Sequence, residues 1–170
     1  MDVMTAIKGR RSIRSYEPSP IDDKKLQLIL EAARLAPSAR NMQEWKFVVV
    51  RDPETKKKLV PAAKNQAFLA EAAAVIAACA LETQHIMTCG QLCYPMDLAI
   101  AVEHMALKAY EEGIGSCWIG AFHEDQAKEI LGIPQRVRIV ALLALGYPKE
   151  SPPPRPRKSL EEIVCHERWS

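Results

Sequence analysis

Residues 97–122, DLAIAVEHMALKAYEEGIGSCWIGAF, combine a helical pattern with a strand pattern. The apolar residues among them cover a broad helical face, and Gly113 stands where a helix that ends in the left-handed conformation takes a glycine. We therefore predict a central helix over 95–112. The run SCWIGAF, residues 116–122, predicts a strand directly after it. Helices and strands thus occur together in this protein.

The flanking sequence predicts further elements of both kinds. Two aspartates at 22–23 open a segment with apolar residues at helical spacing, which Pro37 ends. Asp52 followed by Pro53 is typical of a helix start. The remaining predictions are strands over 46–51, 72–81 and 137–147, short helices over 2–9 and 123–131, and a helical turn that begins at a Ser159–Glu162 capping box.

These elements do not follow the strict βαβ period of a nucleotide-binding sheet. We therefore predict an α+β fold with a mixed, largely antiparallel sheet and helices on both faces. A single domain over 1–170 fits the length of the chain. The proline-rich run SPPPRPRKS (151–159) indicates that residues 151–170 form an extended C-terminal arm, which either wraps its own domain or exchanges onto a partner subunit.

Composition excludes several classes of protein. A formal charge of +2 gives no support for nucleic-acid binding. The uncharged run 72–81 is too short to cross a bilayer, so we expect no membrane partner. Acidic and basic residues at the N-terminus stand in the opposite order to a signal peptide, which favours the cytoplasm. The five cysteines contain no C-x-x-C pair, so we expect reduced thiols.

Basic residues gather at two places that could bind an anion. Arg10, Arg11, Ser12 and Arg14 lie in a turn after the first helix, and Arg155 and Arg157 lie on the arm. Arginine forks bind phosphate through charge-assisted hydrogen bonds, so two or three of them would hold a mononucleotide. A solvated basic turn is an equally open interpretation of the first cluster.

Three other patterns carry weaker predictions. The loop over 37–45 is polar and irregular, which suits either recognition of a heteroaromatic ring or a plain connector. Glycines over 113–120 lack the G-x-G-x-x-G spacing, so no Rossmann fingerprint is present. His85, Cys89 and Cys93 recur every four residues, which would present metal ligands on a helix; we prefer a loop with incidental thiols and expect no metal.

Four segments in register over nearly the whole chain carry a resemblance to a known family: RRSIRSY (10–16), LILEAARLAPSARNMQEWKFVVV (28–50), DLAIAVEHMALKAYEEGIGSCWIGAF (97–122) and RPRKSLEEIV (155–164). Together they resemble the nitroreductase family of FMN-dependent oxidoreductases. The resemblance implies an α+β homodimer with exchanged terminal segments and FMN at the subunit interface.

The resemblance also implies roles for particular residues. Arg10, Arg11, Ser12 and Arg14 would hold the phosphate, ribityl chain and pyrimidine edge of FMN, and Arg155 and Arg157 would complete the phosphate site. The other subunit would lay its loop along the cofactor, with contacts from Pro37, Ser38, Ala39, Asn41 and Gln43. Further contacts are expected from Asn65 and from the backbone of Ile119, Gly120 and Ala121. No side chain is expected to be catalytic, because the flavin N5 carries the chemistry.

The implied function is hydride transfer from NAD(P)H through FMN to a nitroaromatic, quinone or similar small-molecule acceptor, by a ping-pong mechanism. Two alternatives remain: a flavin- or nucleotide-binding module without turnover, and a dehalogenase or flavin-fragmenting relative on the same fold. The segment between Leu81 and Pro95 is compact where many family members carry helices that cover the active site. Substrate choice is therefore not fixed by the sequence.

Overall fold

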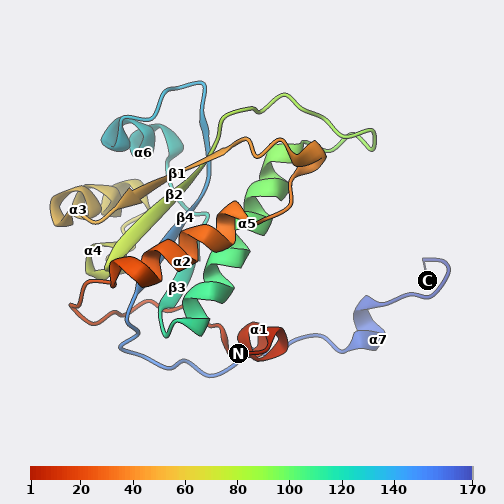
Figure 1. Ribbon diagram of the computed structural model, residues 1–170, viewed down its shortest axis with the longest axis horizontal. Helices are drawn as coiled ribbons and strands as arrows, with labels where there is room; N and C mark the ends of the chain where they lie inside the picture. Colours follow the sequence, from red (N-terminus) through yellow and green to blue (C-terminus); the bar gives the residue numbers. More distant parts are fainter. Residues whose placement is uncertain (170) are drawn as a thin grey trace.

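Within residues 1–169, which the computed structural model describes, four strands form one antiparallel sheet in the order β1-β2-β4-β3 (Figure 1). The strands are β1 (Trp45–Val50), β2 (Ala74–Ala80), β3 (Gly115–Ile119) and β4 (Arg138–Gly146). Every residue of the central strand β2 is buried. Burial on both faces accounts for its continuous apolar run of small residues, AVIAACA.

The chain near the N-terminus adds one parallel contact to this sheet. Ser12 bridges Ser116 in parallel, and the backbone N–H of Ile13 donates to the Ser116 carbonyl at 2.9 Å. This contact extends the sheet beyond β3 and brings the basic turn to its edge. The predicted α+β class, with a mixed and largely antiparallel sheet, is confirmed.

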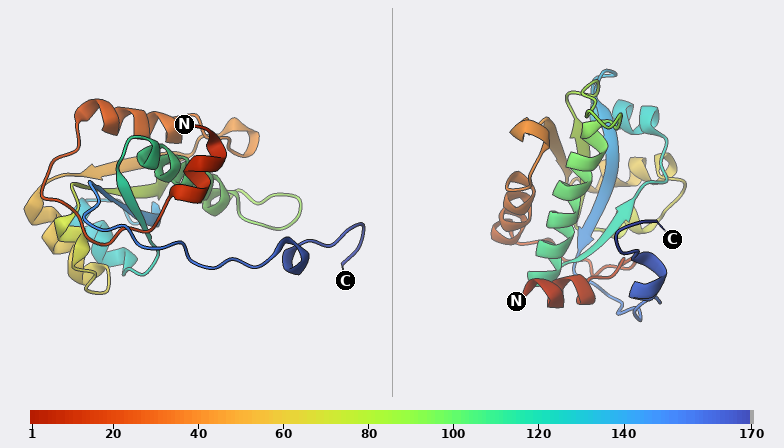
Figure 2. Two further views of the ribbon diagram at one scale, coloured as in Figure 1. Left: turned by 90° about the horizontal axis from the view of Figure 1, so that it is seen from below. Right: turned by 90° about the vertical axis from the view of Figure 1, so that its right-hand side faces the viewer.

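Two long helices cover one face of the sheet. They are α2 (Asp23–Arg34) and α5 (Cys93–Glu111), which lie together on one side of the strands in Figure 2. Asp22 caps α2 by accepting from the Lys24 N–H, as the sequence predicts. α5 begins two residues earlier than predicted, because Pro95 is tolerated in a first turn where its missing N–H is not needed.

Three shorter helices cover the opposite face: α3 (Pro53–Ala62), α4 (Phe68–Glu71) and α6 (Glu124–Leu131). Asp52 caps α3 through the Thr55 N–H, and Gly132 ends α6 in the left-handed conformation. α4 was not predicted. Its four residues have no side-chain cap, so they leave no local signal in the sequence.

The two faces bury separate apolar clusters. Neighbouring residues of β4 point to opposite sides, so that Leu142 packs under α3, α4 and α6 while Leu143 packs under α2 and α5. Both side chains are fully buried. The sheet is therefore the shared centre of the structure, and it holds the ends of β3 and β4 in place for the site described below.

Leu143→Ala is expected to lower the free energy of unfolding by about 2–5 kcal/mol, because it removes buried methyl groups and leaves a cavity beside α5. Denaturant unfolding at constant m-value measures the change. Leu28→Ala on α2 is the matched control, since that leucine is exposed. Equal stability of the two variants would contradict the central place of the sheet.

The terminal segments lie at one end of the sheet. α1 (Val3–Gly9) packs across the end of α5, and the chain after β4 runs past α1 before the short helix α7 (Leu160–Ile163) (Figures 1 and 2). The predicted caps at Asp2 and Ser159 are both formed. The described part of the arm is mostly exposed and points away from the body of the protein.

One predicted bound needs correction. The strand predicted over 116–122 ends at Ile119, so Gly120 and Ala121 lie beyond it. The cause is a contact with α3: the His123 N–H donates to the Ala62 carbonyl at 2.7 Å and draws the chain away from β4. In residues 1–169 we find no helix that combines the length and apolar character needed to span a membrane.

Candidate functional site

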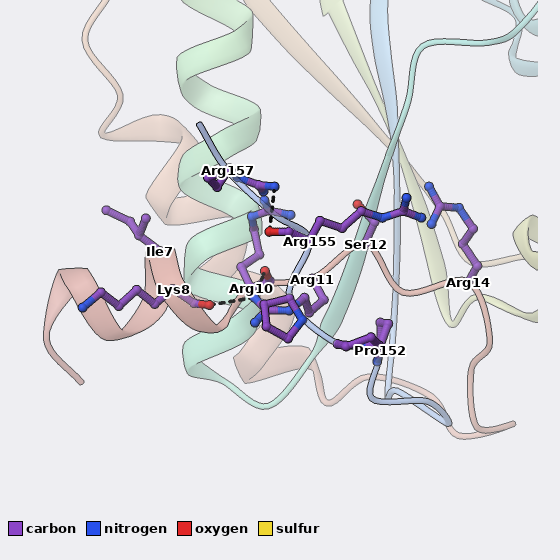
Figure 3. A pocket seen from close by; sticks show the side chains of 11 residues that line it. Ile7, Lys8, Arg10, Arg11, Ser12, Arg14, Pro152, Arg155 and Arg157 are labelled. Atoms are coloured by element: carbon purple, nitrogen blue, oxygen red, sulfur yellow. Dashed lines mark hydrogen bonds between the residues drawn. The ribbon is translucent and has the colours of Figure 1, made fainter. Parts of the chain in front are cut away.

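A basic pocket lies where the turn after α1 meets the arm (Figure 3). It encloses about 480 Å³, and its lining holds cationic side chains and no acidic residue. The lining residues are Ile7, Lys8, Arg10, Arg11, Ser12, Arg14, Pro152, Pro153, Pro154, Arg155 and Arg157. The two basic clusters that the sequence places far apart therefore converge, as a single anion pocket requires.

Local contacts fix the turn that carries the first cluster. The backbone N–H of Arg10 donates to the Ala6 carbonyl and ends α1. Gly9 lies so close to the Tyr110 ring that a Cβ there would come within 2.1 Å of the phenol oxygen. α1 is thus seated on the last turn of α5, and the backbone that follows it is directed along β3.

Glu103 on α5 positions one of the pocket arginines. Its carboxylate lies 3.3 Å from Arg10 Nε and accepts a 3.1 Å hydrogen bond from the Trp118 indole. One acid therefore connects α5, β3 and the basic turn. Sequence reasoning missed Glu103, because nothing local marks a helix glutamate that meets residues from two other elements.

The Arg11 guanidinium is only partly satisfied within the protein. Its Nη1 donates to the carbonyls of Lys8 and Arg10, at 2.6 and 2.9 Å. Its Nε is buried and has no hydrogen-bond partner among the described residues. A buried donor without an acceptor costs stability, so a partner from a ligand is expected at this point.

The other arginines of the pocket are held more loosely. The Arg14 backbone N–H donates to Glu150 Oε1 at 2.5 Å, which ties the turn to the start of the arm. Arg157 donates to the carbonyls of Arg155 and Pro156, at 3.3 and 3.1 Å. In Figure 3 the Arg155 side chain reaches across Ser12 toward Arg14. These contacts leave guanidinium N–H groups free to bind an anion.

A second group of predicted residues meets at the far end of β3. Gln66 donates from Nε2 to the Ala121 carbonyl at 3.1 Å, which brings the chain after β3 beside Asn65. Asn65 is exposed with a positive φ of 58°. No atom lies within 4 Å of the position that a Cβ on Gly120 would take, so the backbone there is open to a flat ligand.

The loop over 37–43 lies at the opposite end of α5 from the basic pocket. The Ala39 N–H donates to both carboxylate oxygens of Asp97, which is near the start of α5, whereas Gly9, directly before the pocket arginines, packs on Tyr110 in the last turn of α5. The thirteen residues from Asp97 to Tyr110 correspond to about 20 Å of helix. A single chain therefore does not bring Pro37, Ser38, Ala39, Asn41 and Gln43 to its own basic pocket.

The backbone of this loop is unusual. Arg40, Asn41 and Gln43 all have positive φ, between 52° and 56°, which is uncommon for residues other than glycine. The Ser38 hydroxyl accepts from the Gln43 N–H at 3.0 Å and closes the loop. Backbone strain of this kind concentrates at functional sites, which favours recognition over the plain connector.

The metal-ligand alternative does not fit the geometry. Residues 81–92 form a loop with an isolated bridge between Ile86 and Leu92, so His85 and Cys89 do not share a helix with Cys93. Among residues 1–169, no three His, Cys, Asp or Glu side chains are grouped to hold a metal ion.

The buried thiols are poor nucleophiles. Burial raises the pKa of Cys79 to about 11 and also raises the pKa of Cys117. Both therefore carry neutral thiols near pH 7 and act as small apolar residues in the core under α3 and α6.

Comparison with known proteins identifies the family. The model of the nitroreductase family matches residues 7–95 and 90–147. The chain belongs to the nitroreductase family. The resemblance found in the sequence is thereby confirmed, and with it the expected fold.

Individual relatives match this chain over most of its length. An NADH dehydrogenase of Thermus thermophilus is 35% identical over 195 residues, which cover 96% of this chain and 95% of the relative. The crystal structure of nitroreductase A from Vibrio parahaemolyticus has a TM-score of 0.92 at 30% identity and covers 100% of this chain and 77% of that one. The NADPH:FMN oxidoreductase from Vibrio harveyi, solved in complex with NAD+, has a TM-score of 0.90 at 27% identity. The match covers 99% of this chain and 78% of that one.

Glu103→Gln is expected to weaken binding of FMN about two- to fivefold, because it removes a half-exposed ion pair that holds Arg10. The glutamine oxygen can still accept the hydrogen bond from the Trp118 indole. Fluorescence titration of FMN measures the change. Glu129→Gln, on the exposed side of α6, should leave the affinity unchanged. The same affinity for wild type and Glu103→Gln would show that Glu103 does not position the pocket.

Proposed function

We propose that this nitroreductase binds FMN and transfers hydride from NAD(P)H to a nitroaromatic, quinone or similar small-molecule acceptor. The observation that carries the proposal is the basic pocket, with the buried Nε of Arg11 that lacks a partner. The family assignment and the names of the Vibrio harveyi and Thermus thermophilus relatives support both the cofactor and the donor class. When bound, FMN supplies a ring nitrogen, N5, that accepts hydride and passes it on.

The chain's own residues would first hold the phosphate. Six cationic side chains line the pocket: Lys8, Arg10, Arg11, Arg14, Arg155 and Arg157. A phosphate offers several strong acceptor oxygens, which suits the free guanidinium N–H groups and the unpartnered Nε of Arg11. The Ser12 hydroxyl lies in the same lining and can donate to the phosphate or to the ribityl chain.

The flavin ring would then lie along β3 toward Gly120. Ser12 is already paired with Ser116 at the start of that strand, so a cofactor anchored at the turn is directed along it. At the far end, the absence of a side chain on Gly120 leaves space for a ring beside the backbone of Ile119 and Ala121. Asn65, exposed next to this backbone, supplies a polar contact. A backbone N–H in this place orients the ring without a side chain.

We further propose that the active unit is a homodimer. Asp97, which holds the loop over 37–43, lies about 20 Å along α5 from Tyr110, on which the turn before the pocket arginines is seated. No residue of the loop lines the pocket of its own chain, so a second copy would have to lay the loop on the cofactor. Apolar side chains left exposed on α1, α5 and the arm favour such an assembly. They include Val3, Met4, Ile7, Met96, Ile100, Leu160, Ile163, Val164 and Trp169.

The proposed ping-pong mechanism follows if only one face of the bound flavin ring is open to substrates. Donor and acceptor would occupy the same place in turn, each close enough to the ring for hydride transfer. Initial rates measured at several fixed concentrations of a quinone acceptor, with NADPH or NADH varied, should give parallel double-reciprocal lines. Intersecting lines would contradict the proposed order, and a bound flavin that is never reduced would favour a module without turnover.

A further inference from the structure

A buried pair of acids lies under the loop over 37–43. Glu44, directly before β1, is 7% exposed, and Asp97, in the second turn of α5, is 5% exposed. Acidic side chains are almost never buried to this degree unless they are paired. Neither has a role in the anion pocket, which lies toward the other end of α5.

The two acids are bonded differently. Asp97 accepts the Ala39 N–H at 3.1 Å with each of its carboxylate oxygens, and so holds the loop down on α5. Both oxygens of Glu44 are buried without a donor among the described residues. The Glu44 backbone is fixed separately, because its carbonyl accepts the Leu81 N–H at 2.9 Å directly beyond the paired residues of β1 and β2.

The groups around Glu44 make an ionised side chain unfavourable. Burial is the main cause that raises the pKa of Glu44, and its own backbone N–H is the main opposing cause. The neighbouring Asp97 side chain raises the pKa further, and His85 lowers it slightly. The Cys93 thiol at the start of α5 belongs to the same cluster, and Arg40 on the loop is its cationic member. Two ionised carboxylates are both acceptors, so a hydrogen bond between them requires a proton on one.

We propose that Glu44 and Asp97 share one proton and act as a positioning pair for the loop over 37–43. With the proton on Glu44, its O–H donates to Asp97, which keeps its negative charge and its two bonds to the Ala39 N–H. The pair thereby offsets the cost of the positive φ values at Arg40, Asn41 and Gln43. The consequence for flavin binding rests on the proposed function, because this loop is the part that would contact the cofactor of a second copy.

The pair makes the loop sensitive to pH in a defined direction. Glu44 keeps its proton in the folded loop to a higher pH than an exposed glutamate does, so the closed loop binds more protons than the open one. The stabilisation is complete below the pKa of an exposed glutamate and is lost as the pH rises through the higher pKa of Glu44 in the closed loop. Above that pKa, two adjacent negative charges oppose the contact between Asp97 and Ala39.

Glu44→Gln tests the proposal in the full-length protein without FMN. The amide keeps the shape of Glu44 and donates to Asp97 at every pH, so the loop should stay closed. The measured quantity is the protection factor of the Ala39 amide against hydrogen exchange across the acidic to neutral range. In wild type it should fall about tenfold for each unit by which the pKa of Glu44 exceeds its ordinary value. In Glu44→Gln it should stay constant.

A second measurement links the pair to the cofactor. The FMN dissociation constant of wild type, divided by that of Glu44→Gln at the same pH, should rise with pH. Titration of the FMN phosphate affects both proteins equally and therefore cancels in this ratio. Asp97→Asn keeps an oxygen for Ala39 and gives ionised Glu44 an amide donor, so it should weaken the pH dependence, of which only the part due to burial of Glu44 remains. Glu129→Gln on α6 should behave as wild type.

The outcomes separate this inference from the proposed function. An Ala39 protection factor with the same pH dependence in wild type and Glu44→Gln would overturn the shared proton, whether or not FMN binds. A flat Glu44→Gln profile in a protein that retains no FMN would support the pair and contradict the proposed function. A flat profile together with a pH-independent ratio of dissociation constants would show that the loop does not contact the flavin.

Discussion

Arg10→Ala/Arg14→Ala is expected to weaken FMN binding at least about 100-fold. Each arginine would contribute charge-assisted hydrogen bonds to the phosphate or the ring edge, worth about 1.5–3 kcal/mol apiece. Arg14 is exposed, so the lower end of that range applies to it. Equilibrium dialysis of the purified variant against FMN measures the loss.

The control for this variant removes the same charge elsewhere. Lys58→Ala/Arg136→Ala deletes two exposed cations on the α3 and α6 side of the sheet and should bind FMN as wild type does. The pair of variants separates a local contact from a general loss of positive charge. Equal weakening by both would mean that the basic turn is only a solvated surface.

Removal of the arm, by ending the chain after Glu150, is expected to have the second largest effect. It deletes Arg155 and Arg157 from the pocket and removes the exposed apolar residues of α7. We expect loss of retained FMN and a monomer in sedimentation velocity, because an exchanged arm would supply part of the subunit interface. A truncated protein that still sediments as a dimer with bound FMN would contradict both roles of the arm.

A full-length variant separates the two roles. Arg155→Ala/Arg157→Ala keeps α7 and its apolar side chains, so it should remain a dimer while it loses affinity for FMN. A monomeric double variant would instead show that the arginines contribute to assembly and that the loss of FMN is secondary.

Local sequence signals predicted most of the secondary structure. The caps at Asp2, Asp22, Asp52 and Ser159 all form, since a capping bond depends only on residues within one turn. The glycine stop at Gly113 adopts a positive φ of 73° as expected. The helix α4 and the true end of β3 were missed because contacts distant in sequence decide them.

The same distinction applies to the site. The sequence identified the two arginine clusters by their composition, and the fold brings them into one pocket. Glu103 and the buried pair of Glu44 and Asp97 had no such signal, because their partners come from other elements of the fold. Acids that position a site through tertiary contacts look like ordinary helix or loop residues until the packing is known.

The visible absorption spectrum of the purified protein, incubated with FMN and desalted, shows whether the chain holds a flavin that NAD(P)H can reduce. The spectrum is recorded before and after anaerobic addition of NADPH and, separately, NADH. We expect about one flavin to be retained per chain and to be bleached rapidly by at least one of the two donors. The protein concentration should be well above the dissociation constant expected for FMN. A protein that retains no flavin after desalting under this condition would contradict the assignment of the basic pocket.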